Sequence, residues 1–176
     1  MNDDWILRPA CDFDGADIAC LIDRVYREHG DRLAARRGDR DVLQIEESYW
    51  RRGGAFVVLE LRHNWSNAGE IVGTAGMMPA ANAGALRRFY VDPAFREHGA
   101  GRVLIRWAVA WAQIRIFKRL EFWSDRRFAK GHRFFEGIGL ERLPGEREMA
   151  DGVVPYHEVL FGGAVEAIAA KLHRDV

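Results

Sequence analysis

The chain has 176 residues, of which 48% are hydrophobic, and it contains six tryptophans. This length and composition predict one globular domain with a substantial core and exclude a disordered protein. Lysine plus arginine and aspartate plus glutamate both number 26, so the formal net charge is zero. A neutral chain has no global field to draw it to nucleic acid or to an anionic membrane.

The start of the chain lacks the basic and apolar segments of a signal peptide, and no apolar run is long enough to span a bilayer. The two cysteines, Cys11 and Cys20, make neither a disulfide framework nor a four-ligand zinc site. We therefore expect a cytoplasmic protein with no metal site and with neither a membrane nor a nucleic acid as partner.

The first third of the chain predicts a strand, two helices and a second strand. Residues 5–9 form the first strand, and apolar residues at helical spacing predict a helix from Asp14 that stops at Gly30. The charged segment 31–41 is interpreted as a mobile loop, and residues 42–51 as a less regular helix. Residues 55–61 have the composition of a buried strand.

The middle of the chain predicts a turn over residues 64–69 and strands over residues 71–78 and 85–91. A helix follows Gly101, and its tryptophans are more typical of core than of a ligand stack. The apolar residues that we expect this helix to bury on one face are Val103, Leu104, Trp107, Ala108, Trp111 and Ile114.

The last third predicts a strand over residues 120–124 and a helix over residues 130–137, with Gly139 as a left-handed cap. Residues 146–149 and 156–161 form a closing hairpin, and an amphipathic helix over residues 164–173 packs on its own domain or on a second subunit. Strands in hairpins followed by strands joined through helices favour an α/β (α+β) fold. We expect a mixed, mainly antiparallel sheet of about six to seven strands with helices on both faces.

Residues 96–101, Arg-Glu-His-Gly-Ala-Gly, lie between a predicted strand and a predicted helix. Glycines let the backbone approach a ligand closely, and the first N–H groups of a helix have no partner inside the helix. These N–H groups also lie at the positive end of the helix dipole, so the turn suits a diphosphate. On its own the hexapeptide is equally consistent with a plain tight turn.

In context, three segments resemble the GCN5-related N-acetyltransferase (GNAT) family. Residues 86–93 look like its fourth strand and the exit from it, Arg96-x-x-Gly99-x-Gly101 fits its acetyl-CoA signature, and residues 131–140 are similar to its late helix. The resemblance covers residues 5–161. It implies a GNAT-like domain over residues 1–161, a C-terminal helical tail over residues 162–176, and fourth and fifth strands that splay apart.

The resemblance also implies acetyl-CoA as co-substrate, with its pantetheine arm in the gap between the two splayed strands. The Val91 N–H would polarise the thioester carbonyl. Arg96 and Arg102 add side-chain contacts to the cofactor unless they are merely solvated. Glu97 puts a negative charge near the diphosphate. Ser124 either binds the cofactor or ends its strand. The implied cofactor-binding residues are Phe89, Tyr90, Val91, Arg96, Glu97, His98, Gly99, Ala100, Gly101, Arg102 and Ser124.

The family's usual proton-transfer positions are altered here. Phe135 replaces the tyrosine that often protonates the leaving thiolate, Trp123 stands where some relatives carry a glutamate base, and Ala85 stands where others bring a carboxylate. The catalytic candidates that remain are His132, Tyr156 and Glu158. His132 shares a helix face with Phe135 and titrates in a useful range, although a surface histidine is an equally open interpretation. Tyr156 and Glu158 share one face of the closing hairpin, with His157 on the other.

These residues predict an enzyme that moves an acetyl group from acetyl-CoA to a primary amine of a small molecule or to an exposed amino group of a peptide, by direct attack in a ternary complex. The altered positions keep open an alternative, a catalytically impaired acyl-CoA sensor. A true P-loop is excluded because GxxxxGK[ST] is absent. The acceptor stays open because segment 31–41 mixes arginines and aspartates, and the amphipathic tail is compatible with a homodimer.

Overall fold

The computed structural model describes residues 5–33, 38–62, 69–150 and 153–174. Within these residues the strands form one seven-stranded sheet in the order β1-β2-β3-β4-β5-β7-β6. The strands are β1 (Trp5–Pro9), β2 (Ala55–Leu61), β3 (Glu70–Ala80), β4 (Ala83–Val91), β5 (Arg119–Asp125), β6 (Glu141–Met149) and β7 (Tyr156–Ala164). The helices are α1 (Gly15–Arg27), α2 (Ile45–Ser48), α3 (Ala100–Ile114), α4 (Ala129–Gly137) and α5 (Val165–Arg174). Short 3₁₀ turns are η1 (Asp12–Asp14), η2 (Arg40–Leu43), η3 (Trp50–Arg52) and η4 (Pro93–Phe95).

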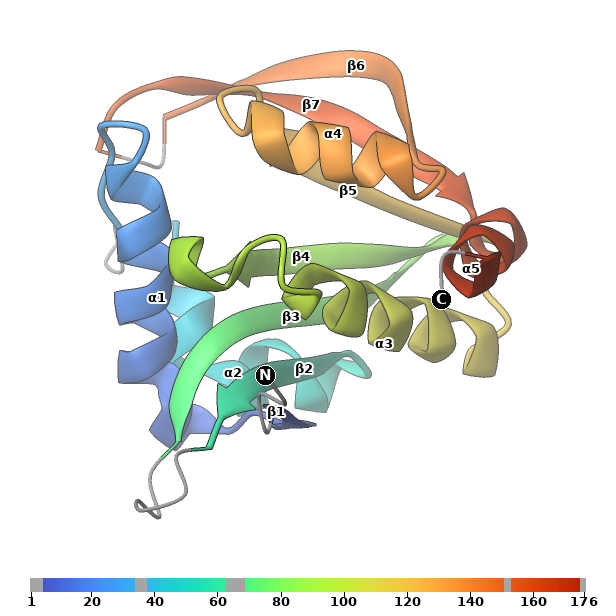
Figure 1. The fold of residues 1–176 in the computed structure, drawn as a ribbon. Helices are drawn as coiled ribbons and strands as arrows, with labels where there is room; N and C mark the ends of the chain where they lie inside the picture. Colours follow the sequence, from blue (N-terminus) through green and yellow to red (C-terminus); the bar gives the residue numbers. More distant parts are fainter. Residues whose placement is uncertain (1–4, 34–37, 63–68, 151–152, 175–176) are drawn as a thin grey trace.

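All neighbouring strands run antiparallel except β4 and β5, which are parallel. This one parallel pair is short, because residues 83–85 pair with residues 119–121 and no further residues of the two strands are in register. Beyond that point β4 and β5 diverge (Figure 1). The prediction of a mixed, mainly antiparallel sheet with a splayed strand pair is confirmed.

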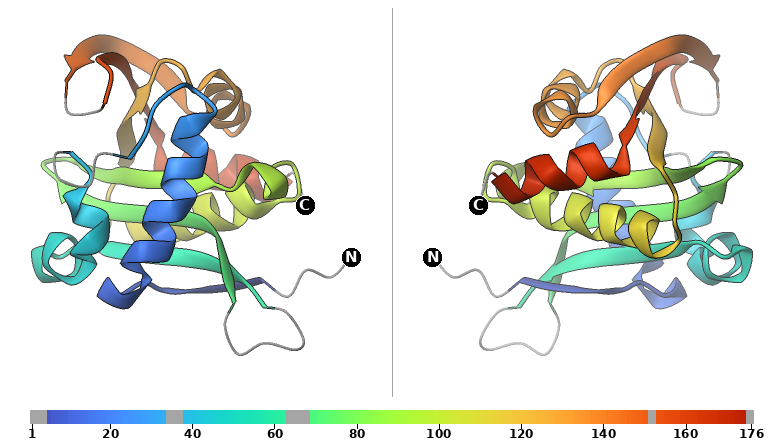
Figure 2. Two further views of the ribbon diagram at one scale, coloured as in Figure 1. Left: turned by 90° about the vertical axis from the view of Figure 1, so that its left-hand side faces the viewer. Right: turned by 90° about the vertical axis from the view of Figure 1, so that its right-hand side faces the viewer.

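Helices cover both faces of the sheet, as the two side views show (Figure 2). On one face α1 and the segment around α2 bury Ile22, Ile45 and Tyr49 against β2 and β3. On the other face α3, α4 and α5 share a larger core with the central strands. The tail helix α5 belongs to this core through Val165 and Ile168, so it packs on its own domain. Gly139 has the predicted left-handed conformation after α4, with φ +94°.

Two predictions about helices are wrong. Ile114 is 81% exposed, whereas Ile105 and Ala112 are fully buried. At 100° per residue Ile114 lies about 120° around α3 from Ala108, the centre of the buried stripe. The predicted face is therefore rotated relative to the face that α3 buries. Residues 42–51 do not form one helix but are divided among η2, α2 and η3, because the backbone leaves helical geometry at Gln44 and Tyr49.

Segment 31–41 is described on both sides of residues 34–37, which lie outside the described residues, as does most of the predicted turn over residues 64–69. In its described part, Asp31 and Asp39 are buried carboxylates. Their charges are therefore held by partners inside the protein instead of being solvated.

Candidate active site

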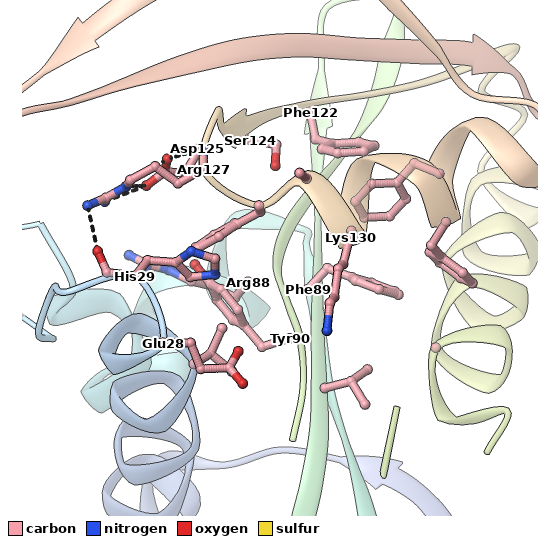
Figure 3. A pocket seen from close by; sticks show the side chains of 18 of the residues that line it. Glu28, His29, Arg88, Phe89, Tyr90, Phe122, Ser124, Asp125, Arg127 and Lys130 are labelled. Atoms are coloured by element: carbon pink, nitrogen blue, oxygen red, sulfur yellow. Dashed lines mark hydrogen bonds and ion pairs between the residues drawn. The ribbon is translucent and has the colours of Figure 1, made fainter. Parts of the chain in front are cut away.

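The gap between β4 and β5 opens into a cavity of about 820 Å³. Its walls come from the end of α1, from β4, from the turn over residues 96–102, from the end of β5 and the start of α4, and from the beginning of β7. Figure 3 shows Glu28, His29, Arg88, Asp125 and Arg127 on the side of β4 that faces α1, and Phe89 and Lys130 on the side toward α3 and α4. We call the first part the acceptor end and the second part the cofactor end.

The cofactor end is shaped by the turn that leads into α3. Gly99 precedes the helix with φ +95°, a conformation that strains any residue with a Cβ. The helix starts at Ala100, so the first N–H groups of α3 have no carbonyl partner within the helix. A Cβ built on Gly101 would lie 3.3 Å from Cζ of Phe134 on α4, which shows how closely the two helices approach.

Most of the residues predicted to bind the cofactor line this cavity. They are Phe89, Tyr90, Val91, Arg96, Glu97, Gly99, Gly101, Arg102 and Ser124. His98 and Ala100 are not among the lining residues. The His98 ring bonds the Arg96 carbonyl through Nδ1 at 2.7 Å, and Ala100, the first residue of α3, is buried in the core.

Strand β4 carries an irregularity next to the cavity. Arg88 has φ +49°, and the pairing of β4 with β3 shifts between Thr74 and Gly76. The Thr74 hydroxyl donates to the Arg88 carbonyl at 2.7 Å and supports the bulge. Leu86 packs with the α3 core, whereas Arg88 bonds to residues on the α1 side, although the two would share a face in a regular strand. The bulge therefore aims Arg88 into the acceptor end.

Arg88, Asp39 and Asp41 form a buried ion cluster, which we call the Arg88 cluster. Arg88 donates to Asp39 Oδ1 and to Asp41 Oδ1, both at 2.6 Å, and to the Gly38 carbonyl at 2.9 Å. The Tyr49 hydroxyl donates to Asp41 Oδ2 at 2.6 Å. Burial acts to lower the pKa of Arg88. The neighbouring groups, Asp41 among them, outweigh this effect and hold the pKa of Arg88 well above its usual value.

A second cluster, the Arg127 cluster, joins Arg127 with Asp31 and Asp125. The Arg127 Nη2 lies 2.8 Å from Asp31 Oδ2 and 2.6 Å from Asp125 Oδ2. Burial acts to raise the pKa of Asp31, but the hydrogen bonds from Arg127 and from the Arg32 backbone N–H outweigh it and lower that pKa. Each of the two clusters therefore joins one guanidinium to two aspartates at the acceptor end.

Aromatic rings pack against one another at the acceptor end. The hydroxyls of Tyr26 and Tyr90 are 3.0 Å apart, and their ring centroids are 5.8 Å apart. Phe128 lies 6.3 Å from the Tyr26 ring, and the His29 ring lies 4.8 Å from Phe128. Burial lowers the pKa of His29, so its imidazole is neutral at neutral pH.

The three predicted catalytic residues differ in position. Tyr156 and Glu158 line the cavity, with the Arg127 guanidinium 5.4 Å from the Tyr156 ring centroid and Glu158 paired to Arg147 at 2.6 Å. His132 is not a lining residue. Its Nε2 lies 3.0 Å from the hydroxyl of Ser124, which does line the cavity.

The environment of His132 is a mixture of apolar and polar groups. Burial lowers the pKa of His132, and a hydrogen bond to the Asp125 backbone opposes that shift. Phe135, one turn along α4, is buried with its ring centroid 4.5 Å from that of Phe122 and 5.4 Å from that of Phe89. Ser124 and His132 therefore carry exchangeable protons, whereas Phe135 has none.

A sequence model of the acetyltransferase (GNAT) family matches residues 22–139. The match spans most of the chain and includes the predicted diphosphate turn and α4. The chain belongs to the GNAT family. Members of this family use acetyl-CoA as co-substrate. No curated protein matches the chain significantly.

Solved structures share the GNAT fold at low sequence identity. A GNAT-family acetyltransferase from Staphylococcus aureus Mu50 is 16% identical, with a TM-score of 0.72 over 92% of this chain and 99% of that one. An acetyltransferase from Streptococcus agalactiae 2603 is 17% identical, with a TM-score of 0.74 over 93% of this chain and 99% of that one. The Salmonella typhimurium protein yncA, solved with its cofactor acetyl-CoA, is 17% identical, with a TM-score of 0.66 over 92% of this chain and 94% of that one.

In this GNAT protein several cavity residues were not anticipated from sequence. Tyr26 lies in the last turn of α1 and His29 two residues beyond the helix, and their spacing of three residues was the only signal that they offered. Arg88 and Arg127 each belong to an arginine doublet of the kind that is usually solvated. Among the described residues no helix is both long and apolar enough to cross a membrane.

Proposed function

We propose that this protein transfers the acetyl group of acetyl-CoA to a primary amine, by direct attack in a ternary complex. The observation that carries the proposal is the cavity between β4 and β5, which joins a glycine turn at the start of α3 to a polar recess beside α1. The two substrates of an acetyl transfer need such a passage, because the amine must reach the thioester carbonyl directly. Family membership and the acetyl-CoA bound to one structural neighbour support the choice of cofactor.

We assign the diphosphate to the backbone N–H groups of residues 97–102, where the helix dipole and the left-handed Gly99 favour an anion. The pantetheine arm pairs with β4 beyond Ala85, where β5 no longer provides a partner. In this placement the Val91 N–H is aimed at the thioester carbonyl. A pre-aimed donor of this kind lowers a barrier by about 3 kcal/mol.

Two proton transfers accompany the bond changes. The neutral amine attacks the carbonyl carbon, the C–N bond forms, the C–S bond breaks, and the thiolate of CoA leaves. We assign protonation of the thiolate to the Ser124 hydroxyl, and the proton that Ser124 loses is restored through Nε2 of His132, 3.0 Å away, after His132 takes up a proton from solvent. The proton lost by the amine goes to His29, whose lowered pKa keeps it neutral at the acceptor end.

Tyr156 and Glu158, which the sequence predicts as catalytic residues, are only alternatives to His29 and Ser124 for proton transfer. Both line the acceptor end, but the Glu158 carboxylate is already held in an ion pair with Arg147. We therefore propose that Tyr156 and Glu158 shape the acceptor end and that His29 and the Ser124–His132 pair move protons.

The test is the rate of thiol release from acetyl-CoA with a panel of amines. Ser124→Ala and His132→Gln each lower kcat by about 100-fold, the lower range for a general acid, with little change in KM for acetyl-CoA. The double variant loses no more than either single one, because the two residues form one relay. His157→Gln is the matched control, since this histidine lies on the other face of β7 beside Glu146. Unchanged turnover in both single variants would sink the relay.

The sensor alternative has one observation in its favour, the buried Phe135 in place of a proton donor. Tight binding of acetyl-CoA with no thiol release across the whole amine panel would establish it and exclude acetyl transfer. Failure to bind acetyl-CoA at all would exclude both functions.

A further inference from the structure

The cavity has an apolar closed end where β4 and β5 come together. Residues 83–85 pair with residues 119–121, so Leu86 and Phe122 are the first residues beyond the paired segment. Both side chains line the cavity, and both are buried, since Leu86 is 3% and Phe122 is 7% exposed. We call this closed end, formed by Leu86, Phe122 and Phe135, the vertex of the cavity.

Phe135 brings a second ring to the vertex from α4. It lines the cavity, and its ring centroid is 4.5 Å from that of Phe122 and 5.4 Å from that of Phe89. Behind these rings lies Phe161, which is fully buried and stacks on Phe122 at 5.6 Å. Because a packed core has little free volume, the vertex cannot deepen unless these rings are displaced.

The two rings of the vertex lie one step deeper than the groups assigned to proton transfer. Phe122 precedes Ser124 by two residues on β5, so both side chains lie on the same face and are about 7 Å apart along the strand. Figure 3 shows that both project from β5 into the cavity. On α4, Phe135 follows His132 by three residues, about one helical turn.

This arrangement limits the space around the thioester. Protonation of the leaving thiolate by Ser124 requires the sulfur of the thioester to lie beside that hydroxyl. An acyl chain that extends from the sulfur toward the vertex then meets the rings of Phe122 and Phe135. An acyl chain that extends in the opposite direction enters the acceptor end, where it occupies the space of the attacking amine. A long chain is therefore unproductive in either direction.

We propose that Phe122 and Phe135 set the length of the acyl group that this protein transfers, so that acetyl is accepted and straight chains of four or more carbons are excluded. The inference rests on the proposed acetyl transfer and assigns the residues that select the acyl donor. Replacing either ring by a small side chain removes the obstacle at the vertex and admits additional methylene groups.

The test compares acyl donors that differ only in chain length. The rate of thiol release is measured with acetyl-CoA, propanoyl-CoA, butanoyl-CoA and hexanoyl-CoA and one amine acceptor. For the unchanged protein, kcat/KM for butanoyl-CoA lies at least about 100-fold below that for acetyl-CoA, because each methylene that does not fit costs about tenfold or more. Phe122→Ala and Phe135→Ala each raise the ratio of kcat/KM for butanoyl-CoA over acetyl-CoA by at least about tenfold.

Two further variants separate chain selection from structural damage. Phe122→Leu keeps more of the packing than the alanine variant and raises the same ratio by at least about threefold, so it replaces Phe122→Ala if that variant does not fold. Leu104→Ala is the matched control, because Leu104 is a fully buried core residue that does not line the cavity. Its truncation lowers the rates with both donors and leaves their ratio unchanged.

The outcomes for the inference and for the proposed function are distinct. Similar kcat/KM values for butanoyl-CoA and acetyl-CoA in the unchanged protein overturn the length limit and leave acetyl transfer standing. An unchanged ratio in every folded variant of Phe122 and Phe135 does the same.

Absence of thiol release with every amine, in a protein that binds acetyl-CoA, overturns acetyl transfer. Isothermal titration then decides the inference. Phe122→Ala or Phe122→Leu lowers the Kd for butanoyl-CoA relative to that for acetyl-CoA by at least about threefold, and an unchanged Kd ratio overturns the inference. A protein that binds neither donor overturns both proposals.

Discussion

Replacing Gly101 by alanine tests the close approach of α3 and α4 at the cofactor end of the cavity. Gly101 is the second residue of α3 and has ordinary helical φ, so alanine gains about 1 kcal/mol in helix propensity there. The new methyl lies 3.3 Å from Cζ of Phe134 and 3.5 Å from the next ring atom, which requires the ring to shift slightly. These effects oppose one another, and the free energy of unfolding changes by less than about 1 kcal/mol.

The effect on cofactor affinity is larger. Gly101 and Phe134 both line the cavity, so the methyl occupies the space in which we place the CoA diphosphate. Displacing the diphosphate loses one charge-assisted hydrogen bond, which contributes about 1.5 to 3 kcal/mol. At about 1.4 kcal/mol for each factor of ten, the Kd for CoA rises about 10- to 100-fold.

Isothermal titration with CoA measures this effect without turnover, and thermal unfolding measures the stability. Gly137→Ala is the matched control, because a Cβ at this glycine of α4 has no heavy atom within 4 Å. It stabilises the fold by up to about 1 kcal/mol and leaves CoA affinity unchanged. A stable Gly101→Ala protein that binds CoA as tightly as the unchanged chain would refute the placement of the diphosphate.

Three further predictions concern stability. Arg88→Met removes the guanidinium shared by the buried Asp39 and the partly exposed Asp41 and lowers the free energy of unfolding by about 3 to 5 kcal/mol in urea titrations; a loss below about 1 kcal/mol contradicts this. Ile114→Ser changes it by less than about 0.5 kcal/mol, whereas Leu104→Ala lowers it by about 2 to 5 kcal/mol, and equal losses would disprove the burial pattern of α3. Burial lowers the pKa of His29 and His132, so their contribution to stability is complete above about pH 6.5 and is lost as the pH falls through the lowered values. Replacing both histidines by glutamine flattens that slope in acid titrations of unfolding, and an unchanged slope would argue against it.

The features that could be predicted from the sequence are those that local chemistry determines. Gly99 and Gly139 adopt positive φ where a turn and a helix end require it. The strand pairs joined by short turns were recognisable from composition, and the splayed pair followed from the family resemblance. The turn before α3 was also recognisable, because two glycines around the start of an amphipathic helix have few alternative structures.

The features that could not be predicted depend on contacts between distant parts of the chain. Arg127 and Asp31 are separated by 96 residues, and nothing in an arginine doublet tells which carboxylate will meet it. Residues 42–51 have helical spacing, but burial of Tyr49 and its bond to Asp41 override that local preference. His29 illustrates the same limit, because its place in the cavity wall is not indicated by its neighbours along the chain.

The short pairing between β4 and β5 has a consequence for the protein without its cofactor. Only residues 83–85 and 119–121 connect the two parts of the sheet directly, so the parts are joined elsewhere mainly by side-chain packing. In the proposed complex the pantetheine arm takes the place of the missing strand pairing, so bound cofactor connects the two parts of the sheet and its release removes that connection. By mass action, CoA at 100 times its Kd stabilises the native state by about 2.7 kcal/mol. The lifetime of this protein would then depend on the supply of CoA as well as on the chain itself.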